Sequence, residues 1–467
     1  MRFLPLSLLC LFLQGCSAGE DLGGMAFTFP AETDYSSVKL QLAKGPSSSS
    51  SEHLREVSVC LRYFTDLPQK GKEQSFFSLA TPAHSNGFLL SKLGRNRHQM
   101  YIGSGVLDFW NLQDELNDWN SFCATWDSKT GLTQVWLNGI PSARKTVFKG
   151  GSLTGKPFVV LGQDQDEYGG GLHANDALVG QLTDVHMWSR VISSCDIKSF
   201  SENRKFERGD MINWHDLEFT VRGHVVLEAV YYKSTCFCVF LFTDVSQPTL
   251  AYNNAFTFGA ETANSYVKVV PVLEGRDIKV ATVCLRYFSD IPGGNREQTF
   301  FSLATPSYSN GFLVCKEGRN RHQLYVGNAR ADFWGLPDDL NAWISFCATW
   351  DSATGLAQVW VNGRPSSRKS LFKGGVLAGT AFVVLGQDQD AYGGRFNTND
   401  ALIGQLTDVH MWDRVISHCE IQQFVENKLS GGGNVINWHE MGYTTHGNVV
   451  EEVKIAEDAF QKCPLPE

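Results

Sequence analysis

The sequence predicts an all-β protein made of two tandem antiparallel β-sandwiches, each with one short helix. Three observations support this fold class. The chain is poor in charged residues (19%) and rich in aromatic residues (12%) and glycine (44 of 467 residues). Nearly all of it consists of an internal repeat. Within each copy, short strand patterns alternate with tight-turn residues, and helical patterns are almost absent.

The internal repeat defines the domain organisation. Cys60 recurs at Cys284 and Cys123 at Cys347, both with an offset of 224 residues. Near the front of each copy the offset is 229, because the first copy carries a serine tract at 47–51 that we interpret as a flexible surface loop. Each copy is of domain size, so the two copies are tandem domains and not solenoid units.

We place the first domain at 19–229, a linker at 230–250 and the second domain at 251–467. The linker contains the apolar stretch 236–242, which is too short to cross a membrane. It is interpreted as a buried linker or an edge strand, and a wrongly joined gene model is the alternative.

The first 18 residues resemble a secretory signal peptide. A short apolar run at 3–13 follows Met1-Arg2 and ends in small residues up to Ala18. A bacterial lipoprotein signal ending at Cys16 is the alternative. The prediction is a secreted, extracellular protein without a transmembrane segment, in which most of the twelve cysteines are paired.

Strand and turn signals are clearest in the middle of each copy. The segments 122–126 and 132–137 are rich in β-forming residues and are joined by a turn at 127–131. Asn138-Gly139 predicts a second tight turn, because both residues tolerate the positive φ of a type I′ hairpin. The helix candidates are 195–203 and 419–428.

Two copies of one motif carry a family resemblance. Ser121-Phe-Cys-Ala-Thr-Trp-Asp-Ser128 and its partner at 345–352 are similar to the pentraxin signature His-x-Cys-x-Ser/Thr-Trp-x-Ser/Thr, with Ser in place of the leading His. The motifs at 161–166 and 180–188 agree, so the chain resembles two pentraxin domains almost end to end. The resemblance implies flattened, lectin-like jelly rolls. It also implies disulfides across the sandwich between Cys60 and Cys123 and between Cys284 and Cys347, each worth about 4 kcal/mol.

The segment after the strand 158–161 predicts a calcium site. Asp164 and Asp166 lie two residues apart, with the main-chain carbonyl of Gln165 between them, and calcium takes six to eight oxygen ligands. The resemblance implies further ligands from other loops, and one or two Ca²⁺ ions per domain. The expected ligands are Asn86, Asp164, Gln165, Asp166 and Asp176 in the first domain and Asn310, Asp388, Gln389, Asp390 and Asp400 in the second.

Two positions in each domain depart from the family pattern, and these departures affect the binding of a second calcium ion. Ser85 and Ser309 stand where the family usually has an acid before the asparagine, and His173 and Asn397 stand where it usually has Glu or Asp. Because a neutral imidazole is a poor calcium ligand, weaker binding is expected in the first domain. A zinc site at His84 and His173 is the alternative for that domain.

The resemblance implies a calcium-dependent, lectin-like protein of innate immunity and the acute phase. Its ligands would be phosphorylated head groups or anionic polysaccharides on microbial or damaged-cell surfaces. Ser91 and Cys315 occupy the slot of an aromatic platform, and Tyr101 and Tyr325 fill a position that is usually small, which disfavours phosphocholine. The alternative is a structural or adhesion β-sandwich without a calcium-dependent ligand.

Other function classes fit the sequence poorly. A jelly-roll glycosidase would need a third acid where Tyr168 stands, so an enzyme is not expected. The formal net charge of −9 removes the electrostatic reason to expect nucleic acid as a partner.

The remaining cysteines allow predictions of further disulfides, and the tandem repeat limits how the chains can form an oligomer. We expect Cys195 to pair with Cys236 or Cys238, Cys419 to pair with Cys463, and Cys315 to be unpaired or to link two chains. A ring-forming homo-oligomer of pentamer type is expected. Whole two-domain chains cannot close a single ring of five domains, and an arrangement open to five chains is two stacked rings with one domain of each chain in each ring.

Overall fold

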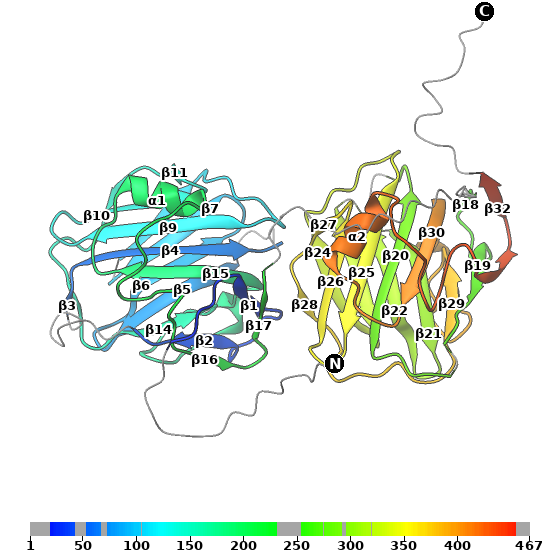
Figure 1. The fold of residues 1–467 in the computed structure, drawn as a ribbon, viewed down its shortest axis with the longest axis horizontal. Coiled ribbons are helices and arrows are strands. Elements are labelled where there is room, and N and C mark those ends of the chain that lie inside the picture. Colours follow the sequence, from blue (N-terminus) through cyan, green and yellow to red (C-terminus); the bar gives the residue numbers. More distant parts are fainter. Residues whose placement is uncertain are drawn as a thin grey trace, which may run out of the picture.

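The computed structural model contains two β-domains that follow one another along the long axis of the molecule (Figure 1). It describes residues 19–42, 53–66, 72–103, 105–230, 254–273, 275–291, 296–318 and 320–453. The signal peptide and most of the linker that the sequence predicts lie outside these residues. No helix in the described ranges is long and apolar enough to span a membrane. Each domain has two facing antiparallel sheets and one α-helix, which confirms the predicted fold class.

The first domain pairs an eight-stranded sheet with a seven-stranded one. The larger sheet has the order β11-β10-β9-β4-β15-β1-β17, with β12 also beside β10, and the smaller has the order β16-β2-β14-β5-β6-β7-β8. The strands and helices are β1 (Met25–Phe29), β2 (Ser37–Leu40), β3 (His53–Leu54), β4 (Glu56–Phe64), β5 (Glu73–Thr81), β6 (His84–Leu93), β7 (Arg97–Ile102), β8 (Gly105–Trp110), β9 (Asn120–Asp127), β10 (Leu132–Leu137), β11 (Ile140–Pro141), β12 (Lys145–Thr146), β13 (Leu153–Thr154), β14 (Phe158–Leu161), η1 (Ala174–Asp176), β15 (Gly180–Trp188), α1 (Ser194–Ser201), β16 (Phe219–Arg222) and β17 (Val226–Ala229).

The second domain repeats the topology of both large sheets, but the small sheet β13-β3 of the first domain is reduced there to an isolated bridge between Ile278 and Leu377. Its sheets have the orders β27-β26-β25-β20-β30-β18-β32, with β28 beside β26, and β24-β23-β22-β21-β29-β19-β31. Its elements are β18 (Asn254–Phe258), β19 (Tyr266–Val270), β20 (Val280–Phe288), β21 (Glu297–Thr305), β22 (Tyr308–Glu317), β23 (Arg321–Val326), β24 (Ala329–Trp334), β25 (Ile344–Asp351), β26 (Leu356–Val361), β27 (Arg364–Pro365), β28 (Lys369–Ser370), β29 (Phe382–Leu385), η2 (Thr398–Asp400), β30 (Gly404–Trp412), α2 (His418–Val425), β31 (Gly442–His446) and β32 (Val449–Val453).

The main core of each domain lies between its two sheets and is rich in aromatic rings. In the first domain, Tyr63 of β4 stacks on Phe76 of β5 with ring centroids 4.4 Å apart, which joins the two sheets. Trp126 and Trp214 are fully buried in the same core. Burial of such large rings removes much apolar surface from water and stabilises the sandwich.

The predicted turns form as expected. Asn138 and Gly139 have φ values of 52° and 78° and join Leu137 to Ile140, so the type I′ hairpin prediction is confirmed. The Asp127 side chain accepts hydrogen bonds from Lys129 N and Thr130 Oγ1 and closes the preceding turn. The helices start one residue earlier than predicted, because Ser193 and Ser417 form capping boxes with Asp196 and Glu420.

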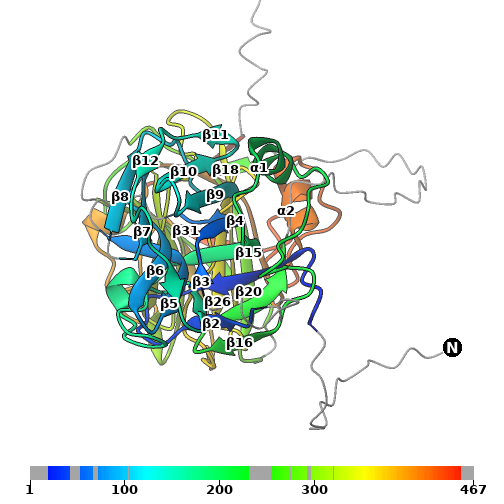
Figure 2. The same cartoon turned by 90° about the vertical axis from the view of Figure 1, so that its left-hand side faces the viewer.

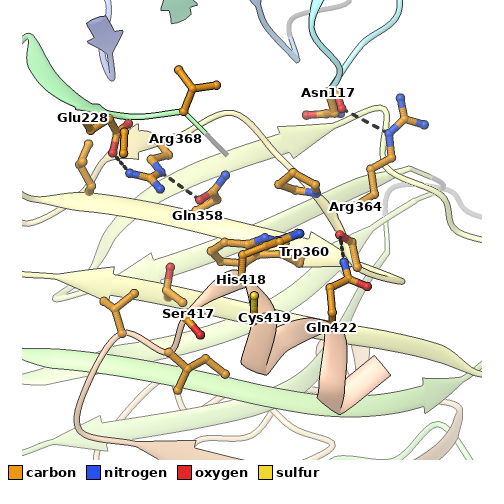
Figure 3. Close-up of a pocket in the computed structure, with 18 of the residues that line it drawn as sticks. Asn117, Glu228, Gln358, Trp360, Arg364, Arg368, Ser417, His418, Cys419 and Gln422 are labelled. Carbon is orange, nitrogen blue, oxygen red and sulfur yellow. Dashed lines mark hydrogen bonds and ion pairs between the residues drawn. The ribbon is translucent and has the colours of Figure 1, made fainter. Parts of the chain in front are cut away.

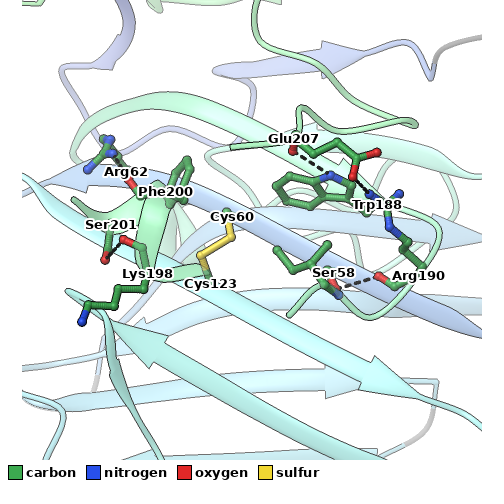
Figure 4. The surroundings of a disulfide bond; sticks show 11 residues. Ser58, Cys60, Arg62, Cys123, Trp188, Arg190, Lys198, Phe200, Ser201 and Glu207 are labelled. Atoms are coloured by element: carbon green, nitrogen blue, oxygen red, sulfur yellow. Dashed lines mark hydrogen bonds and ion pairs between the residues drawn. A yellow bond between two sulfur atoms is a disulfide. The ribbon is translucent and has the colours of Figure 1, made fainter. Parts of the chain in front are cut away.

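Two disulfides implied by the resemblance are present, but they do not cross the sandwich. Cys60 and Cys123 are direct partners in the neighbouring strands β4 and β9, with their Cα atoms 4.1 Å apart, and Cys284–Cys347 repeats this. The first bridge lies on the outer side of the eight-stranded sheet with Trp188 and Phe200 (Figure 4). The sequence could not distinguish a bridge within one sheet from one between sheets.

The other cysteines depart in part from the prediction. Cys195 is free and exposed at the start of α1, so its predicted pairing is wrong for this structure; Cys236 and Cys238 lie outside the described residues. Cys419 is disulfide-bonded, and its predicted partner Cys463 also lies outside them. Cys315 is free and buried, so its thiol is not accessible for a link between chains.

Both domains contain a buried ion pair at the end of β6 or its counterpart β22. Lys316 Nζ lies 3.1 and 3.2 Å from the two carboxylate oxygens of Asp338, and the two residues are 1% and 2% exposed. Tyr287 Oη also donates to Asp338. Lys92 and Asp114 form the same pair in the first domain.

We predict that Lys316→Met destabilises the second domain by about 3–5 kcal/mol, because it leaves the buried carboxylate of Asp338 without its partner. The double variant Lys316→Met/Asp338→Leu should recover most of this loss. Calorimetric unfolding measures both changes. Lys428→Met, which removes an exposed pair with Glu426, is the control and should cost less than about 1 kcal/mol. A loss in K316M as small as in this control would contradict the prediction.

Candidate metal centre

The chain turns sharply after β14 and returns over the neighbouring strand β5. Gly162 makes the turn with a φ of 81°, and a Cβ atom there would collide with the Phe29 ring. Gln165 then fastens the loop to the sheet. Its Nε2 donates to Ser78 O (2.9 Å) and Phe158 O (3.1 Å), and its Oε1 accepts from Gly169 N. The Gln165 side chain is therefore engaged, and only its main-chain carbonyl remains for a cation.

This loop brings together the three predicted acids of the first domain. Asp164 is buried, with 7% of its surface exposed, whereas Asp166 is exposed and Asp176 is half-buried. Burial, followed by the negative charges of Glu73 and Asp166, raises the pKa of Asp164 to about 7. The pKa of Asp176 is raised by burial and by the charge of Asp166.

Glu73, at the start of β5, is a fourth acid that the sequence analysis missed. Burial raises its pKa, and the charges of Asp176 and Asp166 raise it further. It lies about ninety residues before Asp164 in the chain, so no local motif connects them. The signal that was available is the repeat, because Glu297 occupies the same position in the second domain.

Among the predicted ligands of the first domain, two side-chain oxygen atoms are buried without a hydrogen-bond donor in the described part of the chain. They are Oδ1 of Asp164 and Oδ1 of Asn86, which lies on β6, the strand next to β5. The same two atoms are unpartnered in the second domain, at Asp388 and Asn310. A buried acceptor without a donor costs free energy. Such oxygens fit a hard cation, which would replace the missing donors.

The second domain contains the same arrangement. Asp388 is 8% exposed, and burial together with the charges of Glu297 and Asp390 raises its pKa to about 7. The Gln389 side chain is engaged with Ser302 and Phe382, as in the first domain.

A basic side chain lies beside the acids in both domains. In the first domain the charge of Lys72 lowers the pKa of Asp176, and Arg296 takes this position in the second domain. Burial raises the pKa of Asp400, the charge of Asp390 raises it further, and the charge of Arg296 lowers it. The guanidinium group of Arg296 donates to Ala401 O at 2.6 Å. Both sites therefore have a positive charge beside their acids.

The histidines proposed for zinc are not equivalent. His173 Nε2 lies 3.3 Å from Asp166 Oδ2, at the edge of the acid cluster, whereas the His84 ring packs edge-on against Phe148. Among the residues with described positions, no three His, Cys, Asp or Glu side chains could hold a metal ion by themselves. A cation here needs amide and main-chain oxygens as well, which suits calcium and disfavours zinc.

The surroundings of the acids are polar and contain a tyrosine. Burial, followed by the charges of Glu73 and Asp164, raises the pKa of Tyr101 to about 12. Ser91 lies beside Glu73, and Cys315 lies beside Glu297 in the second domain. The position that the resemblance assigns to an aromatic platform thus contacts the acid cluster and holds a small side chain in both domains.

We predict that Glu73→Gln lowers the pKa of Asp164 from about 7 toward its ordinary value, because it removes the like charge that raises this pKa most. Carbon NMR of the Asp164 carboxyl group in metal-free protein measures the midpoint. Glu167→Gln, which neutralises an exposed acid of the same loop, is the control and should leave the midpoint in place. An unchanged midpoint in E73Q would contradict the geometry described above.

Comparisons with known proteins agree with the domain architecture. The family model described as the Pentaxin family matches residues 25–229 and 254–452. Rat serum amyloid P-component is 34% identical over 208 residues, 44% of this chain and 86% of the relative. Pig C-reactive protein is 37% identical over 199 residues, 42% of this chain and 85% of the relative.

Among solved structures, the native heptameric serum-amyloid-P-like pentraxin of Limulus polyphemus matches with 23% identity and a TM-score of 0.39. The match covers 43% of this chain and 95% of that one. Since the family model matches most of this chain in two separate regions, the chain belongs to the pentraxin family and carries two of its domains in tandem.

Proposed function

We propose that this protein is a secreted recognition protein that binds calcium at the acid cluster of each domain. The observation that carries the proposal is the buried, unpartnered oxygen pair of Asp164 and Asn86, repeated at Asp388 and Asn310. Carboxylate, amide and main-chain carbonyl oxygens are the ligands that calcium takes in proteins. In the first domain the ion would be held by Asn86, Asp164, the Gln165 carbonyl, Asp166 and Asp176, with Glu73 in addition.

Electrostatics support a divalent cation at this place. Four carboxylates share a partly buried site, and their mutual repulsion contributes to the raised pKa of Asp164. A bound cation would offset this repulsion. Asp166 and its counterpart Asp390 are exposed, so an ion held here would still be accessible to an outside ligand.

The ligand class follows from the chemistry of such an ion. Calcium supplies a positive charge that coordinates an anionic oxygen from the ligand, such as a phosphate or a sugar carboxylate. Ser91 and Cys315 offer no aromatic face for a quaternary ammonium group. We therefore favour phosphoethanolamine or acidic saccharides on microbial or damaged-cell surfaces over phosphocholine.

A glycosidase is disfavoured by the role of Tyr168. Its hydroxyl donates to Lys156 O (2.8 Å) and its ring packs edge-on against Phe158, so this side chain has a structural role. The position where a glycosidase would need a third acid is thus occupied by a packing residue.

We predict that the metal-free protein binds at least one calcium ion per domain. Asp164→Asn should weaken the first-domain site by at least about tenfold, because it removes one of the few anionic ligands. Asp388→Asn should do the same in the second domain. Calorimetric titration counts the sites, with Glu167→Gln as the control. A complete absence of calcium binding would favour the structural or adhesion alternative.

Calcium-dependent capture tests the ligand class. We expect EDTA-reversible retention on phosphoethanolamine or acidic-polysaccharide resins, and weaker retention on phosphocholine. The double variant Asp164→Asn/Asp388→Asn should lose retention. If the wild-type protein binds calcium but is retained on none of these resins, the ion has a structural role and the proposed ligand class is wrong.

A further inference from the structure

The seven-stranded sheets of the two domains differ at one position near the acid cluster. β8 and β24 are the edge strands of these sheets, and β8 lies at the margin of the first domain in Figure 2. In the second domain, Arg330 of β24 is the direct cross-strand partner of Tyr325. In the first domain, Val106 of β8 is the direct partner of Tyr101. The second domain therefore carries a cation where the first carries an apolar side chain.

The turn before Arg330 is hydrogen-bonded to a predicted calcium ligand. Asn310 N donates to Asn328 Oδ1 (3.0 Å), and Asn328 N donates to Asn310 O (3.0 Å). Arg330 follows Asn328 by two residues. These hydrogen bonds therefore hold the start of β24 beside the second-domain site.

Tyr325 connects this arginine to the acids. Burial raises the pKa of Tyr325 to about 12, a hydrogen bond with Arg330 opposes this rise, and the charge of Glu297 adds to it. In the first domain, Tyr101 Oη donates instead to Gln99 Oε1 (3.2 Å). The tyrosine of the second domain thus lies between a cation and the acid cluster.

The guanidinium group of Arg330 is accessible to a ligand. Its side chain is 48% exposed, and its Nε lies 3.7 Å from Asp332 Oδ1. Asp332 is already engaged by Arg321 (3.0 Å) and Gln323 (2.9 Å). Glu317 pairs with Arg321 at 2.6 Å. These acids are therefore neutralised mainly by other side chains.

The contact between the two domains leaves Arg330 uncovered. In this contact Lys369 Nζ lies 2.8 Å from Asp66 Oδ2, and Arg364 donates to Asn117 O (3.4 Å; Figure 3). β24 meets the first domain at its last residue, whose main-chain oxygen accepts a hydrogen bond from Asn117 Nδ2 (2.6 Å). Arg330 lies near the opposite end of this strand.

We propose that the second-domain site selects ligands with two anionic groups, one for the calcium ion and one for Arg330, and that the first-domain site does not. This inference rests on the proposed calcium site. A guanidinium group binds carboxylate and phosphate oxygens through charge-assisted hydrogen bonds. Val106 is 51% exposed and offers only apolar contact at the same place in the first domain. Polyanionic saccharides would therefore be captured mainly through the second domain.

A matched pair of small ligands tests this selectivity. Phosphonopropionate and propylphosphonate differ only in a carboxylate that replaces a methyl group. Calorimetric titration measures both ligands in Asp164→Asn and in Asp388→Asn, at a calcium concentration that fills only the intact site. In Asp164→Asn we expect phosphonopropionate to bind about three- to tenfold more tightly, as an exposed charge-assisted contact allows. In Asp388→Asn we expect equal affinities.

Exchanging the two residues should exchange the selectivity. Arg330→Val in the Asp164→Asn background should abolish the preference for phosphonopropionate. Val106→Arg in the Asp388→Asn background should create one. Lys428→Met, which removes an exposed cation after α2, is the control in the Asp164→Asn background and should leave the preference unchanged. Thermal unfolding shows that each variant is folded.

The possible failures are distinguishable. Equal affinities in Asp164→Asn would overturn this inference and leave the proposed calcium site standing, because propylphosphonate binding still reports that site. A preference that survives Arg330→Val would also overturn it. Calcium binding without binding of either phosphonate would refute the proposed ligand class together with this inference. An absence of calcium binding would refute the calcium site itself.

Discussion

The return of the chain after β14 over β5 is the constraint on which the candidate site depends. Gly162 permits the turn, and the hydrogen bonds of Gln165 to Ser78 and Phe158 hold it. This clamp keeps Asp164 beside Glu73 in a place with little water, although the two carboxylates repel each other. The packing of the sandwich therefore stabilises a charge arrangement that is unfavourable by itself, as is common at functional sites.

The two sheets of each domain serve different purposes. The seven-stranded sheet contains β5, β6 and β14, which carry the acid cluster and Asn86. The eight-stranded sheet contains the disulfide between β4 and β9, and a small second core lies between that sheet and α1. The disulfide and the helix thus belong to the sheet opposite the candidate site, whereas the buried pairs Lys92–Asp114 and Lys316–Asp338 lie on the sheet that carries it.

The two copies have kept their cores and changed their surfaces. Strand order, disulfides and the Gln165 clamp recur in the second domain. One difference lies at the candidate site, where His173 of the first domain is replaced by Asn397 in the second. Two weak sites on one chain would act together on a multivalent surface and give avidity.

The sequence by itself determined the repeat, the strands, the tight turns and the pair Asp164 and Asp166, because these depend on local residue patterns. Only the tertiary structure decided that Glu73 joins the acids, that the Gln165 side chain is engaged and that Cys60 and Cys123 lie in one sheet. It also decided that Asp66 is buried against Lys369 while Asp290 is exposed. These outcomes depend on which distant strands and domains pack together, and local pattern carries no information about that.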